Sequence, residues 1–396
     1  MTEILLIIFF ISVLLFFLGS GIWVALSMIG VSAIGMMLFT SRPVGDAMAT
    51  TIWGTSSSWT LTALPLFVWM GEILFRTKLS ENLFKGLSPW MQKLPGGLIH
   101  VNIVGCALFA AISGSSAATV ATVGKMSIPE LRKRKYPEKI LLGSLAGSGT
   151  LGLLIPPSII LIIYGVAVQE SIAKLFIAGI IPGIMIALIF MTYVIIWSLI
   201  NKKIMPKILE EYSLIEKIKR SKQLLPIIIL ISAVIGSIYT GIATATEAAS
   251  LGVLGALILS YFQKSLTIET FKSSLLGATK TSCMIAFILA GSTFLSLAMG
   301  FTGLPRNLAI WIQNMELSPY VLIFVLMIFY VILGMFLDGI SAVVLTMAII
   351  EPMIRQAGFD MIWFGIFLVI VVEMAQITPP VGFNLFVLQG MANKDM

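Results

Sequence analysis

Long runs of hydrophobic residues dominate the chain and predict membrane-spanning helices. Runs long enough to cross a hydrocarbon core of about 30 Å include Ile4–Leu18, Ile22–Leu38, Leu224–Ile238 and Leu322–Leu337. Roughly ten such segments fill the sequence and leave no room for a separate soluble domain. The first run follows Glu3 without a preceding Lys or Arg, so we interpret it as a retained helix rather than a cleaved signal peptide. The pattern therefore predicts an all-α polytopic membrane protein.

An internal repeat divides the chain into two halves. Pro156-Pro157 recurs as Pro379-Pro380, and Pro129 recurs as Pro352 at an identical spacing along the chain (379 − 156 and 352 − 129). The spacing from Gly114 to Gly339 is nearly the same (339 − 114). Landmarks that repeat in the same order at nearly one offset indicate a duplicated unit.

The loop charges indicate that the two halves are inverted. The loop after Pro129 is strongly basic (Arg132, Lys133, Arg134, Lys135, Lys139), whereas its counterpart Glu351–Asp360 carries Arg355 against two acidic residues. Basic short loops stay cytoplasmic, so these two loops should lie on opposite faces. An odd number of membrane crossings between the two loops also places them on opposite faces. We expect five, near 140–165, 172–200, 224–240, 247–262 and 271–300. We expect an inverted repeat of residues 1–200 and 224–396, joined by a basic cytoplasmic linker over 201–223.

Each half contains two segments that are unlike an ordinary spanning helix. Residues 95–130 are apolar but interrupted by Ser113-Gly114-Ser115-Ser116, and residues 318–353 are interrupted by Asp338-Gly339-Ile340-Ser341. Gly and Ser favour a turn there, which predicts two re-entrant hairpins. The next segments, 140–165 and 361–390, are broken by their double prolines. Non-helical backbone at membrane depth persists where protein or a water-filled cavity satisfies it.

The breaks expose oxygen atoms and helix ends that suit ions. Carbonyl and hydroxyl oxygens suit a sodium ion, and amides at half-helix N-termini suit a carboxylate. We therefore pair each hairpin tip with the double proline of its own half and expect two cation sites flanking one substrate site. The expected sodium-binding residues are Ser113, Gly114, Ser115, Ser116, Gly152, Ile155, Pro156, Asp338, Gly339, Thr378, Pro379 and Gly382. The expected substrate-binding residues are Ser116, Thr119, Asp338, Ser341, Pro157 and Pro380.

Structural interpretations of the same residues stay open. Small residues also allow close helix packing, which is a sufficient reason for any single Ser or Gly. Asp338 is a costly carboxylate at membrane depth, which indicates function, but Asp is also a good helix N-cap. For Glu72, Glu247 and Glu373, which also lie in apolar runs, we favour structural or interface roles.

Composition and charge narrow the function further. The chain of 396 residues is 58% hydrophobic and 11% charged, far from the values of soluble domains. Its net charge of +7 follows from the basic loops and does not indicate nucleic-acid binding. One histidine, two cysteines and no phosphate-binding Gly-Lys-Ser/Thr loop argue against an enzyme, a resident cofactor or direct use of ATP. Transport is the remaining class.

These segments together resemble the large membrane (permease) subunit of tripartite ATP-independent periplasmic (TRAP) transporters, within the ion transporter superfamily. The similarity covers essentially the whole chain and depends on Gly114–Thr119, Leu154–Ser158, Thr244–Ala249 and Gln376–Gly382. The resemblance implies an elevator-type transporter in the bacterial inner membrane that couples sodium to organic-acid uptake. Its implied partners are a small four-helix membrane subunit and a soluble periplasmic substrate-binding protein. Family members usually continue with another hydrophobic helix, which we expect this sequence, ending at Met396, to lack.

Two alternatives and the substrate stay open at this point. A stand-alone sodium/dicarboxylate-type symporter would share the hairpin logic but need no binding protein. A channel would need a continuous pore, for which re-entrant hairpins can supply a filter. Sialic acid, C4-dicarboxylates, other sugar acids and keto acids all fit a carboxylate site.

Overall fold

All regular secondary structure in the described part of the chain is helical. The computed structural model describes residues 2–77, 79–206, 212–304, 307, 310, 318–380 and 382–392. In the first half the helices are α1 (Thr2–Gly19), α2 (Val24–Phe39), α3 (Val44–Ser56), η1 (Trp59–Thr62), α4 (Ala63–Phe75), α5 (Leu79–Met91), α6 (Ile99–Ser113), α7 (Ser116–Lys133), α8 (Glu138–Gly149), α9 (Leu151–Leu154), α10 (Ile159–Ala167) and α11 (Ile172–Ile200). In the second half they are α12 (Leu214–Ser221), α13 (Leu225–Tyr239), α14 (Ala245–Phe262), α15 (Ile268–Thr302), α17 (Pro319–Gly334), α18 (Gly339–Gln356), α19 (Met361–Gln376) and α20 (Phe383–Ala392).

The predicted hydrophobic spans coincide with helices. Among the described residues, α11, α14, α15 and α18 are each long and apolar enough to cross a membrane. Three bent pairs raise that number to as many as seven. One of them is the predicted first broken helix, where α8–α9 and α10 meet at 41°. The all-α membrane fold and the helix breaks expected from the sequence are therefore confirmed.

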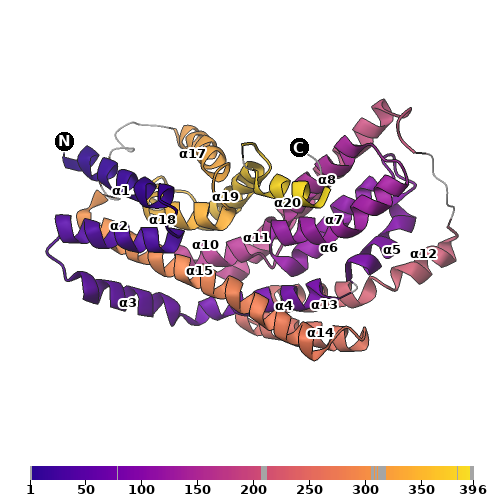
Figure 1. Ribbon diagram of the computed structural model, residues 1–396, viewed down its shortest axis with the longest axis horizontal. Helices are drawn as coiled ribbons and strands as arrows, with labels where there is room; N and C mark the ends of the chain where they lie inside the picture. Colours follow the sequence, from indigo (N-terminus) through magenta and orange to yellow (C-terminus); the bar gives the residue numbers. More distant parts are fainter. Residues whose placement is uncertain are drawn as a thin grey trace.

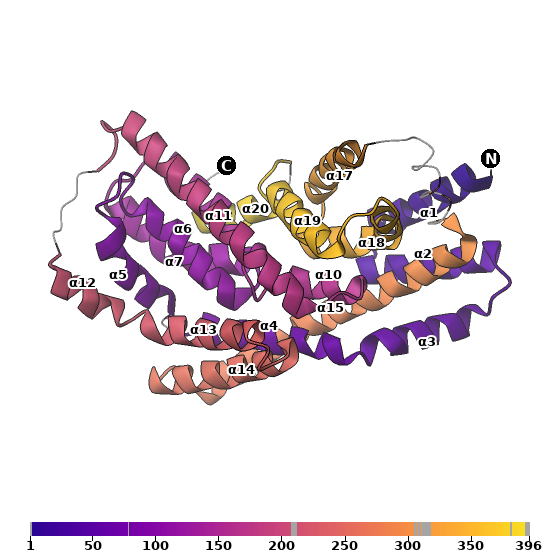
Figure 2. The ribbon, with the colours of Figure 1, turned by 180° about the vertical axis from the view of Figure 1, so that it is seen from behind.

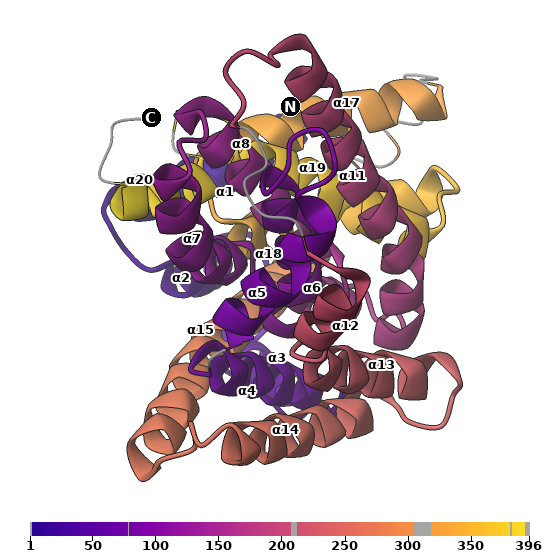
Figure 3. The same ribbon diagram turned by 90° about the vertical axis from the view of Figure 1, so that its right-hand side faces the viewer.

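The helices form two groups, and the long helix α15 packs on α3 and α4 of the first group. Figure 3 shows α3, α4, α13 and α14 together in one layer, with α7, α11, α19 and α20 on the other side. Helix α15 runs diagonally across the molecule in Figure 1, and from behind, in Figure 2, α11 crosses the second group. One continuous buried core joins the two groups, and it includes Phe67 and Leu289 on one side and Tyr164 and Val369 on the other.

The helix boundaries repeat as the sequence pattern does. Helices α7 and α18 begin and end at one constant offset (339 − 116 and 356 − 133), which is also the offset between the starts of α8 and α19 (361 − 138). This offset equals the one that separates the two double prolines. The first element that differs is α15, which is continuous where its counterpart α3–η1–α4 is bent by 52°.

Two arginines at equivalent positions make reciprocal contacts between the halves. Arg132 at the end of α7 donates to the Ala392 carbonyl at the end of α20, at 3.1 Å. Arg355 at the end of α18 donates to the Val168 carbonyl that follows α10, at 2.9 Å. Each arginine thus binds the C-terminal end of the half-helix that follows the double proline of the other half, where a cation is favoured. Such reciprocal contacts are expected when two halves are related by a pseudo-twofold axis.

The linker between the halves is partly helical. Helix α12 lies inside the expected linker 201–223 and begins with a capping box between Ser213 and Glu216. The sequence analysis predicted only a basic linker here, although Leu214, Ile215 and Ile218 have the spacing of one apolar helix face. Residues 207–211 of the linker lie outside the described residues.

Candidate functional site

The first hairpin turns at a glycine that the geometry requires. Helix α6 ends at Gly114, whose φ of +59° lies in the left-handed region that favours glycine. Ser115 then begins α7 as its N-cap and accepts a hydrogen bond from the Ala118 amide. The Ser113 hydroxyl and the Thr119 hydroxyl lie 2.7 Å apart, and Thr119 also donates to the Ser115 carbonyl at 2.8 Å. The turn over Ser113–Thr119, hereafter tip 1, is a compact cluster of hydroxyl and carbonyl oxygens.

Tip 1 packs directly on the first double proline. The Ile159 amide donates to the Gly114 carbonyl at 3.3 Å. A Cβ on Gly114 would lie 2.9 Å from the Pro157 carbonyl oxygen, and one on Gly152 would lie 2.6 Å from the Ser115 carbonyl oxygen. Both glycines are therefore needed for this close approach. The structure brings together the tip and the break of the first half, as the sequence-based pairing expected.

The second hairpin turns at an aspartate that caps a helix. Asp338 is the N-cap of α18, and its Oδ2 accepts a hydrogen bond from the Ser341 amide at 3.1 Å. Ser341 is buried at 2% exposure, and Gly339 is buried as well. The capping interpretation of Asp338 is confirmed, and the same carboxylate also lines the cavity described below, so its functional role stays a prediction. We refer to Asp338–Ser341 as tip 2.

A glutamine at the end of α19 contacts both tips. Gln376 is buried at 3% exposure, and its Oε1 accepts a hydrogen bond from the Ser116 hydroxyl at 2.7 Å. Its Nε2 lies against Gly339, so closely that a Cβ there would clash with it. A single amide side chain thus joins the turn of the first hairpin to the turn of the second.

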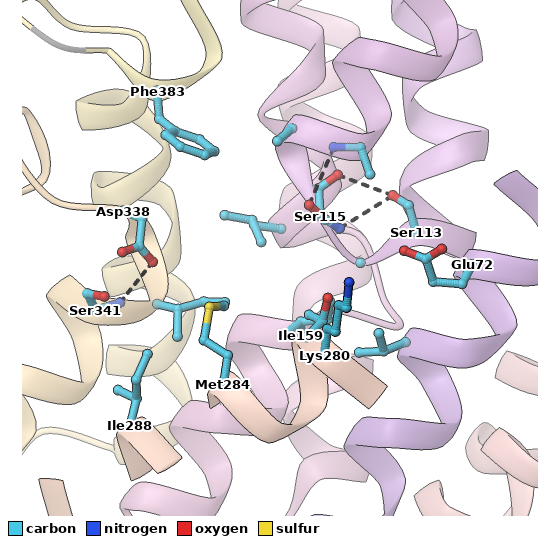
Figure 4. Close-up of a pocket in the computed structure, with 18 of the residues that line it drawn as sticks. Glu72, Ser113, Ser115, Ile159, Lys280, Met284, Ile288, Asp338, Ser341 and Phe383 are labelled. Carbon is cyan, nitrogen blue, oxygen red and sulfur yellow. Dashed lines mark hydrogen bonds between the residues drawn. The ribbon is translucent and has the colours of Figure 1, made fainter. Parts of the chain in front are cut away.

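Both tips open onto one cavity of about 1410 Å³. Tip 1 contributes Ser113, Gly114 and Ser115, and tip 2 contributes Asp338 and Ser341. Figure 4 shows the two tips on opposite sides of this space, with Glu72 and Lys280 beside tip 1. Helices α4 and α15 form a further wall of the cavity. Helix α4 belongs to the layer of α3, α4, α13 and α14, and α15 borders that layer.

The remaining predicted residues lie near one or the other of the two tips. Ser116 and Thr119 are the buried part of tip 1, and Pro156 and Pro157 are buried at the first break. Ile155, half-buried, ends α9. At the second break Gly382 is buried, Thr378 is half-buried, and Pro379 and Pro380 are exposed. None of these residues is part of the cavity lining, and Val381 lies outside the described residues.

Two polar residues of the site were not predicted from the sequence, whereas two glutamates have the roles expected of them. Gln376 lies in the segment Gln376–Gly382 that carries the family resemblance, but the sequence pattern assigns no role to it or to Lys280. Glu373 has the expected structural role, since it is buried and its Oε1 accepts from the Leu153 amide at 3.0 Å. Glu247 forms a capping box with Thr244 at the start of α14, which is a structural role. A polar residue inside an apolar helix was the available signal for both missed residues.

Comparisons with known proteins agree with this architecture. The family model described as "Tripartite ATP-independent periplasmic transporter, DctM component" matches residues 9–396. The C4-dicarboxylate TRAP transporter large permease protein DctM of Pseudomonas aeruginosa is 33% identical over 357 residues, which cover 90% of this chain and 82% of that protein. The isethionate TRAP transporter permease protein DctMQ of Oleidesulfovibrio alaskensis is 30% identical over 383 residues, 95% of this chain and 59% of that protein.

A solved structure shares the fold. The Alcanivorax borkumensis YdaH transporter superposes with a TM-score of 0.63 at 12% identity, covering 94% of this chain and 90% of that one. At that identity the likeness concerns the fold alone. The family match over nearly the whole chain, together with the relatives, is decisive: this chain belongs to the family of large permease (DctM) components of tripartite ATP-independent periplasmic transporters.

Proposed function

We propose that this chain catalyses sodium-coupled uptake of a small organic anion across the bacterial inner membrane. The observation that supports this most is the cavity of about 1410 Å³ onto which both hairpin tips open. Ligand pockets usually measure about 300–1,000 Å³, so this one admits a dicarboxylate or a sugar acid. A relative of this chain is named for C4-dicarboxylates and another for isethionate, and both substrates are organic anions.

Tip 1 has the features of a sodium site. Its hydroxyl and carbonyl oxygens, from Ser113, Ser115 and Thr119, lie within hydrogen-bonding distance of one another. Oxygen ligands at short range suit a hard cation. The second cation site would use Asp338 and Gly339 at tip 2, with Thr378, Pro379 and Gly382 approaching from the second break. Of the residues expected to bind the substrate, Asp338 and Ser341 line the cavity and would contact it, whereas Ser116, Thr119, Pro157 and Pro380 lie outside the lining and would act only indirectly.

The arrangement of the helices suits an elevator mechanism. The hairpins and broken helices, α6–α10 and α17–α20, would move together as the transport domain. Helices α4, α13, α14 and α15 would stay in place as the scaffold, because they form the separate layer seen in Figure 3 or border it. The cavity lies between these two groups, where such a movement would expose the substrate to either side.

The proposed complex contains two further proteins. The DctMQ relative is longer than the matched region, since this chain covers 59% of it, and its name combines two components. This supports a small membrane subunit as partner, and the periplasmic part of the family name supports a soluble binding protein. The linker 201–223 would face the cytoplasm, because its basic residues follow the orientation rule.

Uptake into proteoliposomes tests this function. The chain, with and without the small subunit and the binding protein from its genomic neighbourhood, is given an inward sodium gradient and radiolabelled dicarboxylates, sialic acid, sugar acids, keto acids and isethionate. We expect sodium-driven uptake that requires the binding protein. Uptake without that protein would favour the stand-alone symporter, and uptake unaffected by sodium would contradict the coupling.

Two substitutions separate the roles of Asp338. Asn is also a good N-cap, so Asp338→Asn keeps the start of α18 while removing the charge, and Asp338→Ala removes both. We expect both variants to insert into the membrane and to lose uptake. Wild-type uptake by Asp338→Asn would show that the residue acts only as a cap.

A further inference from the structure

A lysine lies on the scaffold side of the cavity. Lys280 belongs to α15, a helix of 35 residues, and lines the cavity beside Thr281 and Met284. At 1.5 Å per residue it is about 18 Å from the start of that helix, deep within a predicted span. A charged side chain at such depth is costly and usually faces a water-filled cavity with a function.

The neighbouring carboxylate is already neutralised by another residue. Glu72 on α4 forms an ion pair with Arg76, which also donates to the Ser273 hydroxyl at 3.0 Å. The Glu72 carboxylate packs over Gly277, one turn before Lys280 on α15. Within the described part of the chain, no carboxylate comes within salt-bridge distance of Lys280 itself.

The second carboxylate of the cavity lies on its other side. Figure 4 shows Asp338 across the pocket from Lys280, and the Asp338 carboxylate is turned to the Ser341 amide. Lys280 instead faces tip 1, where Ser113 and Ser115 are drawn. One side of the cavity therefore carries Lys280 and the hydroxyl groups of tip 1, beside a Glu72 that is paired with Arg76, and the other side carries the Asp338 carboxylate.

We propose that Lys280 binds an acidic group of the organic anion while the anion occupies this cavity. An ammonium group has three donors on a flexible stem, so it can bind a carboxylate or a sulfonate at varied angles. The proposal rests on the proposed function and adds a specificity-determining contact from the scaffold. Since the scaffold stays in place during an elevator movement, this contact forms in one state of the transporter and is lost as the transport domain moves away.

Uptake kinetics of three variants test this role. Lys280→Gln should raise the KM for the transported anion by about ten- to a hundredfold, the loss expected for a hydrogen bond to a charged group. Its half-saturating sodium concentration should stay at the wild-type value. Lys280→Arg should restore most of the affinity. Lys272→Gln is the matched control, since Lys272 lies on the same helix outside the cavity lining, and it should behave as wild type.

A native cysteine supplies a binding readout that needs no transport. Cys283 is exposed and lines the cavity one turn from Lys280, whereas Cys106 is fully buried. In detergent, the bound anion should protect Cys283 of the wild type from a maleimide. Lys280→Gln should need about ten- to a hundredfold more anion for equal protection. A Cys283→Ser variant, which should lose the labelling, confirms which thiol reacts.

The outcomes distinguish the two proposals. Wild-type KM and wild-type protection in Lys280→Gln would overturn the role of Lys280 and leave the transport function intact. The same KM increase in Lys272→Gln would also overturn it, because the effect would then come from net charge. A wild type that shows neither uptake nor protection with any anion of the panel would overturn the proposed function and this inference together.

Discussion

The hydrogen bond between Ser116 and Gln376 gives a quantitative test of how the two halves are joined. The Ser116 hydroxyl donates to the Gln376 Oε1 at 2.7 Å, and the two residues are 3% exposed. Interhelical side-chain hydrogen bonds in membrane proteins average about 0.6 kcal/mol in double-mutant cycles and reach about 1.7 kcal/mol. Because both partners here are almost completely buried, we expect a coupling energy of about 1 kcal/mol.

The cycle consists of Ser116→Ala, Gln376→Met and the double variant. Each single change leaves one buried polar group without its partner, at a cost of about 1–3 kcal/mol. The double variant leaves neither, so it should be about 1 kcal/mol more stable than the sum of the single changes predicts. The free energy of unfolding is measured by SDS titration in mixed micelles. The control cycle pairs Gln376→Met with Ser250→Ala on α14, in the other layer of helices, and should be additive. A Ser116–Gln376 coupling indistinguishable from that control would refute the reasoning.

Three further predictions concern packing and a loop. Gly152→Ala should lower both uptake and the unfolding temperature in detergent, because its Cβ would lie 2.6 Å from a carbonyl oxygen of tip 1; Gly143→Ala, with nothing within 4 Å, should match wild type. Arg355→Gln should lower the free energy of unfolding by about 1 kcal/mol in an SDS titration, since it loses its bond to the Val168 carbonyl; an unchanged value would contradict this. Burial raises the pKa of Tyr136, in the loop after α7, so the folded state holds the phenol proton more tightly than the unfolded state. The stability difference between wild type and Tyr136→Phe should therefore be constant below about pH 10 and fall as the pH rises further, which thermal unfolding at a series of pH values measures.

The breaks of the fold were predictable because local chemistry causes them. Gly114 adopts a left-handed conformation, Ser115 and Asp338 act as N-caps, and each double proline removes two amide donors from its helix. These effects depend on residues next to one another in the sequence. The constant offset between the two halves then predicted where equivalent helices begin, and α7 and α18 agree with it at both ends.

Contacts between the halves could not be predicted in the same way. Gln376 is 260 residues from its partner Ser116, and Lys280 reaches the cavity only because α15 passes beside tip 1. Each of these side chains stands out in the sequence only because it is polar within an apolar helix. The sequence therefore identifies a candidate site residue but not the residue that it contacts. The placement of Thr378, Pro379 and Pro380 outside the cavity lining likewise depends on how α20 leaves α19.

The two halves share a backbone repeat but differ in charge at the tips. Ser115 and Asp338 are equivalent positions, since they are the N-caps of α7 and α18, so a neutral hydroxyl in the first half corresponds to a carboxylate in the second. The proposed cation sites therefore differ by one formal charge. At 4 Å and an effective dielectric constant of about 20, that charge attracts a sodium ion by about 4 kcal/mol before the cost of desolvation. The site at tip 2 should then hold its ion at lower sodium concentration, and Asp338→Asn should make the two sites more alike. In titrations of binding against sodium, this would appear as the loss of the tighter phase, whereas two unchanged phases would show that the carboxylate does not face the ion.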